Sequence, residues 1–399
     1  MLLLLIRRHA SFFVMAASAG VLYLVNILLA GLLTEADYGY YALLISFMSV
    51  VASFGLGGFD QALVRTAKVL NGRLCVSRYL AVSALISAVL FSVASYAYFR
   101  VLGVGNELLA LISTLAIALG LFGYGVGRLK RAFVFAQFAH GGHRILLGLG
   151  LTLLWLTGEQ ISVEVIEWVL CGGAVIVACV VAFYVVKHAE LDFRSDLGVA
   201  VLSFAFGYSV SMLLMNAIGF ADRFLVERFF GLEVAAKFFF YANIYVFPFA
   251  LLQGYVGFRE LSHYKERFSL GLLHKDLLKS GVLFSLVLIL CIAADFLLTK
   301  YFLQGRFEIS IIERVLLACL GGARIVYGSL SAAFGAVASS RAIHRVNLVT
   351  VSAGIGALGL FVYALPDSLA ALMACFLFVW LARASSVYFL VCKGRSDAV

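Results

Sequence analysis

The chain has 399 residues, of which 64% are hydrophobic and 13% are charged, and its formal net charge is +9. Its mean hydropathy of +1.06 leaves too little polar surface to cover a water-soluble globule of this size. These values exclude soluble globular classes and predict an integral membrane protein with one membrane domain that fills the chain.

The apolar runs predict about twelve membrane spans of ~20 residues each. Unpaired backbone groups are costly in lipid and the runs lack strict alternation, so helices are expected, which makes the predicted fold class all-α. In chain order, the predicted spans cover residues 11–33, 40–62, 79–99, 108–127, 136–157, 165–186, 198–220, 238–258, 280–299, 315–338, 346–365 and 368–391.

Basic residues are concentrated in alternate connectors. This asymmetry predicts that the basic side is cytoplasmic and that both termini lie there. Orientation therefore accounts for most of the positive charge, and a nucleic-acid partner is not required. The connectors on the other side hold Arg100, Arg223, Arg228, Lys237, Lys300, Arg306 and Arg314.

A stretch of sequence is repeated half a chain length apart, between Gly31–Ala42 and Gly231–Ala242. Paired halves in a membrane chain are typical of transporters with a central site. We therefore predict two lobes, residues 1–194 and 195–399, whose equivalent outer hairpins contain the two copies. The matched residues are Gly31 and Gly231, Leu32 and Leu232, Ala36 and Ala236, Tyr41 and Tyr241, and Ala42 and Ala242.

Two runs of glycine occur inside predicted spans, at 120–127 and 354–359. Small residues let membrane helices approach closely, so these runs predict helix packing. They do not occur at a strand-to-helix turn, which argues against a phosphate-binding loop. Cysteine and histidine spacing shows no metal pattern, and no bound cofactor is expected.

Two stretches resemble the family of polysaccharide repeat-unit flippases, also called O-antigen flippases. The first is Leu32–Leu43, followed by Phe54-Gly-Leu and Arg65. The second is Ala221–Gly231, followed by Tyr241-Ala242, although no glycine here matches Gly39.

This resemblance implies membership of the multidrug/oligosaccharidyl-lipid/polysaccharide exporter superfamily. The implied fold is two six-helix lobes around a V-shaped cleft that opens to each side in turn. The implied cargo is an undecaprenyl-diphosphate-linked oligosaccharide, flipped to the outer leaflet of the bacterial inner membrane. Membrane lipids, a polysaccharide polymerase and glycosyltransferases are the implied partners.

A lipid diphosphate needs cationic partners, and arginine binds phosphate through two parallel hydrogen bonds. Arg65 and Arg144 lie near the predicted cytoplasmic ends of spans, where they could meet the diphosphate. Arg65 could equally extend to the interface, and Arg144 could anchor its helix.

Charged residues deep in a span cost ~3 kcal/mol on insertion scales and normally face a cavity or a partner. Arg324 and Arg383 are candidates for binding the substrate, whereas Asp60 and Asp295 are candidates for coupling to a proton or sodium gradient. An ion pair of Asp295 with one of the arginines is the alternative.

Asp222 and Arg223 are predicted at the outer end of the seventh span. They could bind sugar or gate the cleft, or they could form an ion pair at a helix end with Glu227 or Arg228 in water.

Three other functions remain as alternatives. A cation-coupled antiporter of small molecules or drugs would have the same fold. A membrane glycan polymerase or ligase would handle the same lipid, but such enzymes typically have a large outer loop and the outer connectors here are short. The third is a scaffold that does not transport. We therefore predict a transporter rather than an enzyme.

Overall fold

The computed structural model describes residues 2–70, 73–192, 199–338 and 340–393, and these form an almost entirely helical chain. Among the described segments, nine helices are long and apolar enough to cross a membrane. The predicted fold class, an all-α integral membrane protein with many spans, is confirmed.

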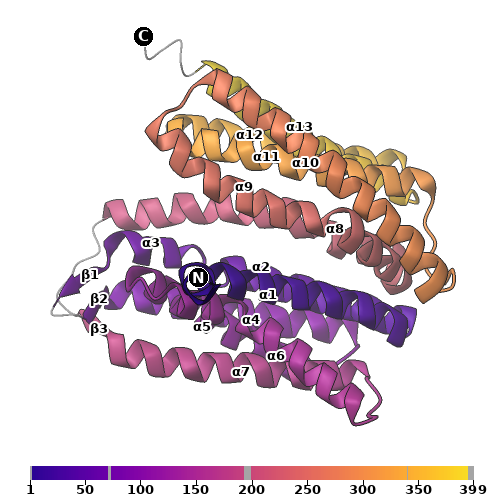
Figure 1. Cartoon of the computed structure of the whole chain (residues 1–399), viewed down its shortest axis with the longest axis horizontal. Helices are drawn as coiled ribbons and strands as arrows, with labels where there is room; N and C mark the ends of the chain where they lie inside the picture. Colours follow the sequence, from indigo (N-terminus) through magenta and orange to yellow (C-terminus); the bar gives the residue numbers. More distant parts are fainter. Residues whose placement is uncertain (1, 71–72, 193–198, 339, 394–399) are drawn as a thin grey trace. The chain divides into compact units, whose positions relative to one another are not determined.

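Helices and three short strands follow one another along the chain (Figure 1). The first half comprises α1 (Leu2–Leu32), α2 (Glu35–Phe54), α3 (Phe59–Thr66), β1 (Lys68–Leu70), β2 (Arg73–Ser77), α4 (Arg78–Leu102), α5 (Glu107–Leu129), α6 (Phe133–Leu156), α7 (Val163–His188) and β3 (Ala189–Asp192). The second half comprises α8 (Val199–Tyr245), α9 (Phe247–Glu266), α10 (Leu270–Leu297), the π-helical turn η1 (Leu298–Phe302), α11 (Ile311–Val337), α12 (Ser340–Ala364) and α13 (Leu369–Lys393).

The chain divides into two compact units, Met1–Asn216 and Ala217–Val399. Helix α8 contributes residues to both units. The predicted lobes, 1–194 and 195–399, and the cleft between them stay predictions.

Helix α5 is the centre of the first unit. It contacts α2, α3, α4, α6 and α7, and 67% of its most apolar stretch is buried. An added Cβ at Gly120 would lie 2.6 Å from the carbonyl oxygen of Ala139 in α6, and one at Gly123 would lie 2.4 Å from Val181 in α7. The glycine run at 120–127 therefore allows close helix packing, as predicted.

Helix α11 has the corresponding place in the second unit. It contacts α9, α10 and α13, and 61% of its most apolar stretch is buried. An added Cβ at Gly321 would lie 2.4 Å from the carbonyl oxygen of Tyr245, and one at Gly328 would lie 3.1 Å from that of Gln253. Both units thus pack their helices around one small-residue helix.

The packing prediction is wrong for the other glycine run. Added Cβ atoms at Gly354, Gly356 and Gly359 in α12 would meet no atom of the described chain within 4 Å. These three glycines therefore do not bring α12 close to another helix of the second unit.

A three-stranded sheet, which the span pattern did not predict, lies at one end of the first unit (Figure 1). Strand β2 pairs with β1 in antiparallel fashion and with β3 in parallel fashion. Leu74 and Val76 of β2 are buried, whereas Arg73 is exposed and lies 3.8 Å from Glu190 of β3. This alternation is typical of a strand with one covered face.

Three predicted boundaries differ from the observed helices. The predicted span 40–62 is split into α2 and α3 because Gly57 and Gly58 have φ values of +59° and +79°, which end the helix. The predicted connector between residues 220 and 238 is helical, and only Gly231 departs from helical geometry. The predicted span 238–258 is divided after Tyr245, where Pro248 lies in the first turn of α9.

The repeated stretches form buried segments with similar roles. Tyr41 and Tyr241 are 1% and 0% exposed. The Tyr41 hydroxyl donates to Oδ1 of Asn26 at 2.7 Å, and the Tyr241 hydroxyl donates to the carbonyl oxygen of Phe307 at 3.0 Å. Each tyrosine therefore ties its segment to a neighbouring part of the chain.

Candidate functional site

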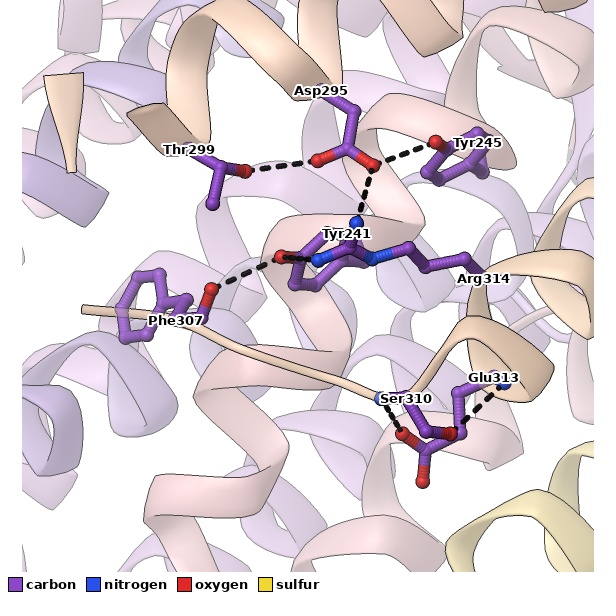
Figure 2. A network of polar contacts seen from close by, with 8 residues as sticks. All are labelled: Tyr241, Tyr245, Asp295, Thr299, Phe307, Ser310, Glu313 and Arg314. Atoms are coloured by element: carbon purple, nitrogen blue, oxygen red, sulfur yellow. Dashed lines mark hydrogen bonds and ion pairs between the residues drawn. The ribbon is translucent and has the colours of Figure 1, made fainter. Parts of the chain in front are cut away.

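The second unit holds a buried carboxylate beside a cavity, at the end of α10. Asp295 is 4% exposed and precedes the π-helical turn η1 (Figure 2). Such irregular turns are frequent at functional sites because they change the direction of the side chains that follow. The sequence predicted Asp295 as a coupling residue, and the structure places it where a cavity reaches it.

Three side chains hold the Asp295 carboxylate (Figure 2). The Tyr245 hydroxyl donates to Oδ2 at 2.7 Å, and the Thr299 hydroxyl donates to Oδ1 at 2.9 Å. Nη1 of Arg314 lies 3.6 Å from Oδ2. Asp295 thus forms an ion pair with an arginine, but with Arg314 rather than with Arg324 or Arg383.

Arg314 extends the network to the repeated stretch. Its Nη2 donates to the Tyr241 hydroxyl at 3.0 Å, and its guanidinium carbon lies 5.1 Å from the centre of the Tyr241 ring. Ser310 and Glu313 form a capping box that fixes the start of α11 and so the position of Arg314 in its first turn. A cation at a helix N-terminus is unfavourable, and the carboxylate of Asp295 offsets this.

A cavity of about 720 Å³ adjoins this network. Its wall carries both signs of charge, with Asp295 and Glu308 opposed by Lys300 and Arg314. Glu308 and Lys300 are exposed, whereas Asp295 is buried. The cavity is large enough for a small solute and gives a cation a route to the carboxylate.

A second polar cluster joins α8 to α11. Asp222, Arg223 and Arg324 are 8%, 9% and 8% exposed, and their charges interact. Nη2 of Arg324 donates to the carbonyl oxygen of Gly219 at 2.8 Å. Within the described part of the chain, Nε of Arg324 is buried and makes no hydrogen bond.

Aromatic rings surround these two arginines. The guanidinium of Arg223 lies 5.2 Å from the Phe220 ring and 5.3 Å from the Phe239 ring, and that of Arg324 lies 5.2 Å from the Trp380 ring. Two arginines and one carboxylate thus lie together in an apolar setting. Such a setting strengthens the attraction for an anion.

The placement of Asp222 and Arg223 differs from the prediction. The sequence placed them at the outer end of the seventh span, but α8 continues past them to Gly231 and both are buried. Arg324 was predicted deep in its span with Asp295 as one possible partner, and the structure brings it to Asp222 and Arg223 instead. Pairing across helices depends on depth and rotation, which hydropathy does not report.

Arg383 of α13 has a separate and neutral set of partners. It is 5% exposed, and its Nε donates to the Tyr327 hydroxyl at 2.8 Å. Its Nη1 donates to Thr350 at 3.0 Å and to Asn347 at 3.4 Å. These bonds link α11, α12 and α13, so they favour a packing role for Arg383.

The remaining predicted residues lie in the first unit. Asp60 is 5% exposed in the first turn of α3, and Arg65 is in the same helix, with its side chain outside the described residues. Arg144 of α6 is half-buried, and its charge acts on His140 and His143.

Sequence reasoning missed one buried carboxylate in the first unit. Glu167 of α7 is 2% exposed, and it accepts hydrogen bonds from the Tyr40 hydroxyl at 2.5 Å and from the backbone N–H of Asn106 at 2.9 Å. Glu167 falls inside the predicted span 165–186, so it is a carboxylate within a span that was not named beside Asp60 and Asp295. Tyr40, which lies in the repeated stretch, is the residue that could have suggested a buried acceptor.

Comparison with known proteins finds similarity in structure but not in sequence. No protein-family model matches the chain, and no curated protein is significantly similar to it. A multidrug resistance MATE family transporter of the MOP superfamily, in its inward-facing conformation, superposes with a TM-score of 0.60 at 14% identity, over 96% of this chain and 94% of that chain. A MATE family transporter in its outward-facing conformation superposes with a TM-score of 0.58 at 14% identity, over 97% of this chain and 94% of that chain.

A third similar structure is a MOP superfamily transporter from Pyrococcus furiosus, described as having a binding pocket of reverse polarity that suggests a different function. It gives a TM-score of 0.55 at 14% identity, over 97% of this chain and 94% of that chain. The chain therefore has the fold of MOP superfamily transporters along almost its whole length.

Proposed function

We propose that this chain is an alternating-access transporter that exchanges a cation for a small organic solute. The similar structures include inward-facing and outward-facing MATE transporters, which supports a transport cycle of this kind. The observation that carries the proposal is Asp295, a buried carboxylate that adjoins a cavity of about 720 Å³. No chemical step on the solute is part of the proposal.

Asp295 is the proposed coupling group. Its Oδ2 lies 3.6 Å from Nη1 of Arg314, so a proton or Na⁺ at the carboxylate competes with this charge contact and with the hydrogen bonds from Tyr245 and Thr299. A bound cation cancels the attraction between Asp295 and Arg314, and so loosens the link between the end of α10 and the start of α11. Binding of the cation thereby biases the conformation of the second unit.

The solute is proposed to carry negative charge. Arg324 keeps a buried Nε that makes no hydrogen bond in the described part of the chain, and the Trp380 ring lies 5.2 Å from its guanidinium. A cationic drug would be repelled there. The reverse polarity described for the Pyrococcus furiosus transporter is consistent with different pocket charges on one fold.

A transport assay tests the antiporter. Proteoliposomes are loaded with the organic anion carboxyfluorescein, or in parallel with the cation ethidium, and a proton or Na⁺ gradient is imposed. We expect gradient-driven release of carboxyfluorescein that is lost in Asp295→Asn. Glu308→Gln, which removes an exposed carboxylate from the same cavity, should release dye at the wild-type rate.

Two outcomes contradict this proposal. Release of carboxyfluorescein that needs no gradient would rule out cation exchange. Equal release by the wild type and Asp295→Asn would remove Asp295 from the coupling step.

A second candidate function is the flipping of a lipid-linked oligosaccharide. The sequence resemblance and the two buried arginines of this cluster, Arg223 and Arg324, favour it, because a diphosphate suits two guanidinium groups. In this case the protein would act in the bacterial inner membrane, with both termini cytoplasmic, beside a polysaccharide polymerase and glycosyltransferases.

Ligand binding separates the two candidates. A short-chain isoprenyl diphosphate and carboxyfluorescein are titrated separately into the purified protein, and thermal unfolding is followed. Stabilisation by the isoprenyl diphosphate alone would favour the flippase, whereas stabilisation by carboxyfluorescein alone would favour the antiporter.

A further inference from the structure

An apolar groove lies in the first unit, lined by residues that belong to none of the clusters described above. It has a volume of about 410 Å³ and is bordered by α4, α5 and α7 and by strand β3. Its wall is formed by Leu, Val, Ala and Phe side chains, with Glu190 as the charged residue at one end. The groove has no part in the proposed transport cycle.

The groove opens toward lipid rather than toward the protein core. Leu85 of α4 is 51% exposed and Val186 of α7 is 78% exposed, and both line the groove. Both helices are long and apolar enough to cross a membrane. Acyl chains are therefore the surroundings of this opening.

One end of the groove lies where the helices meet the sheet, and this end is basic. Arg78 is the first residue of α4, two positions after the lining residue Val76. Lys187 is in the last turn of α7, directly after the lining residue Val186. Both cations are exposed.

These two cations are available to a ligand. The guanidinium of Arg78 packs 4.7 Å from the Tyr79 ring and donates to the Tyr79 hydroxyl at 2.7 Å. In the parts of the chain that the structure describes, neither Arg78 nor Lys187 forms an ion pair, whereas Arg73 is paired with Glu190. A tyrosine beside a cation is typical of the level of lipid headgroups.

We propose that this groove binds an anionic phospholipid, with one acyl chain along the α4–α7 groove and the phosphate at Arg78 and Lys187. The apolar wall alone would accept any lipid chain. The two cations select for a negative headgroup, because basic residues near a bilayer surface attract anionic lipid. The bound lipid fills the space between α4 and α7 and so stabilises the first unit.

Native mass spectrometry of the purified full chain tests the proposal, with phosphatidylglycerol and phosphatidylcholine as probes. The wild type is expected to retain phosphatidylglycerol preferentially. The double variant Arg78→Gln/Lys187→Gln should bind it about fivefold more weakly for each charge removed. Arg100→Gln, at the opposite end of α4, is the charge control and should bind as the wild type does.

A second variant tests the groove independently of charge. Ala182 lines the groove and is exposed, so Ala182→Phe should fill the space without disturbing the core and should abolish preferential retention. Ala94→Phe, at an exposed site of α4 outside the groove, is the size control. The midpoint temperature of thermal unfolding should rise when phosphatidylglycerol is added, both in the wild type and in the two control variants.

Three results would overturn the lipid site. The first is equal retention of the two lipids by the wild type. The second is unchanged retention in Ala182→Phe. The third is stabilisation by inorganic phosphate as large as that by phosphatidylglycerol, which would mean that the cations bind phosphate without the acyl chain.

Discussion

Arg324 and Arg383 are both buried arginines of the second unit, but their neighbours differ. Arg324 shares its surroundings with Asp222 and Arg223 and keeps a buried Nε without a hydrogen bond in the described structure. Arg383 donates to Tyr327, whose hydroxyl is neutral. At the residue scale, this contrast separates an arginine that can accept an anion from one that holds helices together.

Arg324→Gln is expected to weaken solute binding about tenfold or more, since a hydrogen bond to a charged group contributes about 1.5–3 kcal/mol. Carboxyfluorescein release at rising internal dye concentrations would measure the change. Lys275→Gln removes an exposed cation of α10 and should leave release unchanged. Equal, mild effects of the two changes would contradict a cationic solute site at Arg324.

Arg383→Leu is expected to destabilise the second unit by about 1.5–3 kcal/mol or more, because Tyr327 and Thr350 lose a charged donor in a buried place. Thermal unfolding in detergent would report the loss. Transport per folded molecule should stay within about twofold of the wild type at a temperature where the variant is folded. A stable variant without transport would instead assign Arg383 to the solute site.

At the element scale, the two central helices depend on glycine for close approach. Gly120 of α5 and Gly321 of α11 each face a backbone carbonyl of a neighbouring helix, of Ala139 and Tyr245 respectively. Backbone atoms cannot rotate away as side chains can. The position of these helices therefore depends on the absence of a Cβ atom.

Gly120→Ala and Gly321→Ala are each expected to lower the free energy of unfolding by about 1–3 kcal/mol, the usual cost of overpacking. Gly356→Ala in α12 is the matched control, since an added Cβ there meets no described atom within 4 Å. It should be neutral or stabilising by up to about 1 kcal/mol, because alanine favours the helix. A change of the same sign and size in all three variants would mean that contact with the added Cβ atom does not decide the outcome.

At the scale of the whole molecule, hydropathy predicted most helices and the all-α class, and the glycine run at 120–127 predicted close packing of α5. The breaks at Gly57–Gly58 and after Tyr245 were missed, because local backbone geometry ends those helices inside apolar runs. The sheet was missed because its strands are short and lie in connectors.

The candidate sites were predicted less completely than the fold. Asp295, Asp222, Arg223 and Arg324 were identified as candidates, but their grouping was not. Arg314 was counted as an outer connector residue, although it is the partner of Asp295. Which charges meet depends on how each helix is rotated and how deep it lies, and one sequence does not carry that information.

The predicted orientation of the whole chain can be tested by labelling. Glu159→Cys, in the exposed connector between α6 and α7, should react with a membrane-impermeant maleimide on intact cells. Lys275→Cys in α10 should react only after permeabilisation, since the positive-inside rule places it in the cytoplasm. A background in which the seven native cysteines are replaced is needed. If the Lys275→Cys variant were labelled on intact cells and the Glu159→Cys variant only after permeabilisation, the predicted topology would be wrong and its inverse would hold.

The β2–β3 pairing has a consequence for how the first unit deforms. Strand β2 leads directly into α4 and β3 directly follows α7, so backbone hydrogen bonds fasten these two helix ends together. The two helices cannot separate there without breaking that ladder. Near their opposite ends, at Leu102 and Val163, the two helices are linked differently, because the Glu167 carboxylate of α7 accepts from the Asn106 backbone just past α4. The first unit therefore has a backbone ladder at one end of this helix pair and a link through one side chain near the other, where protonation or substitution of Glu167 would loosen it.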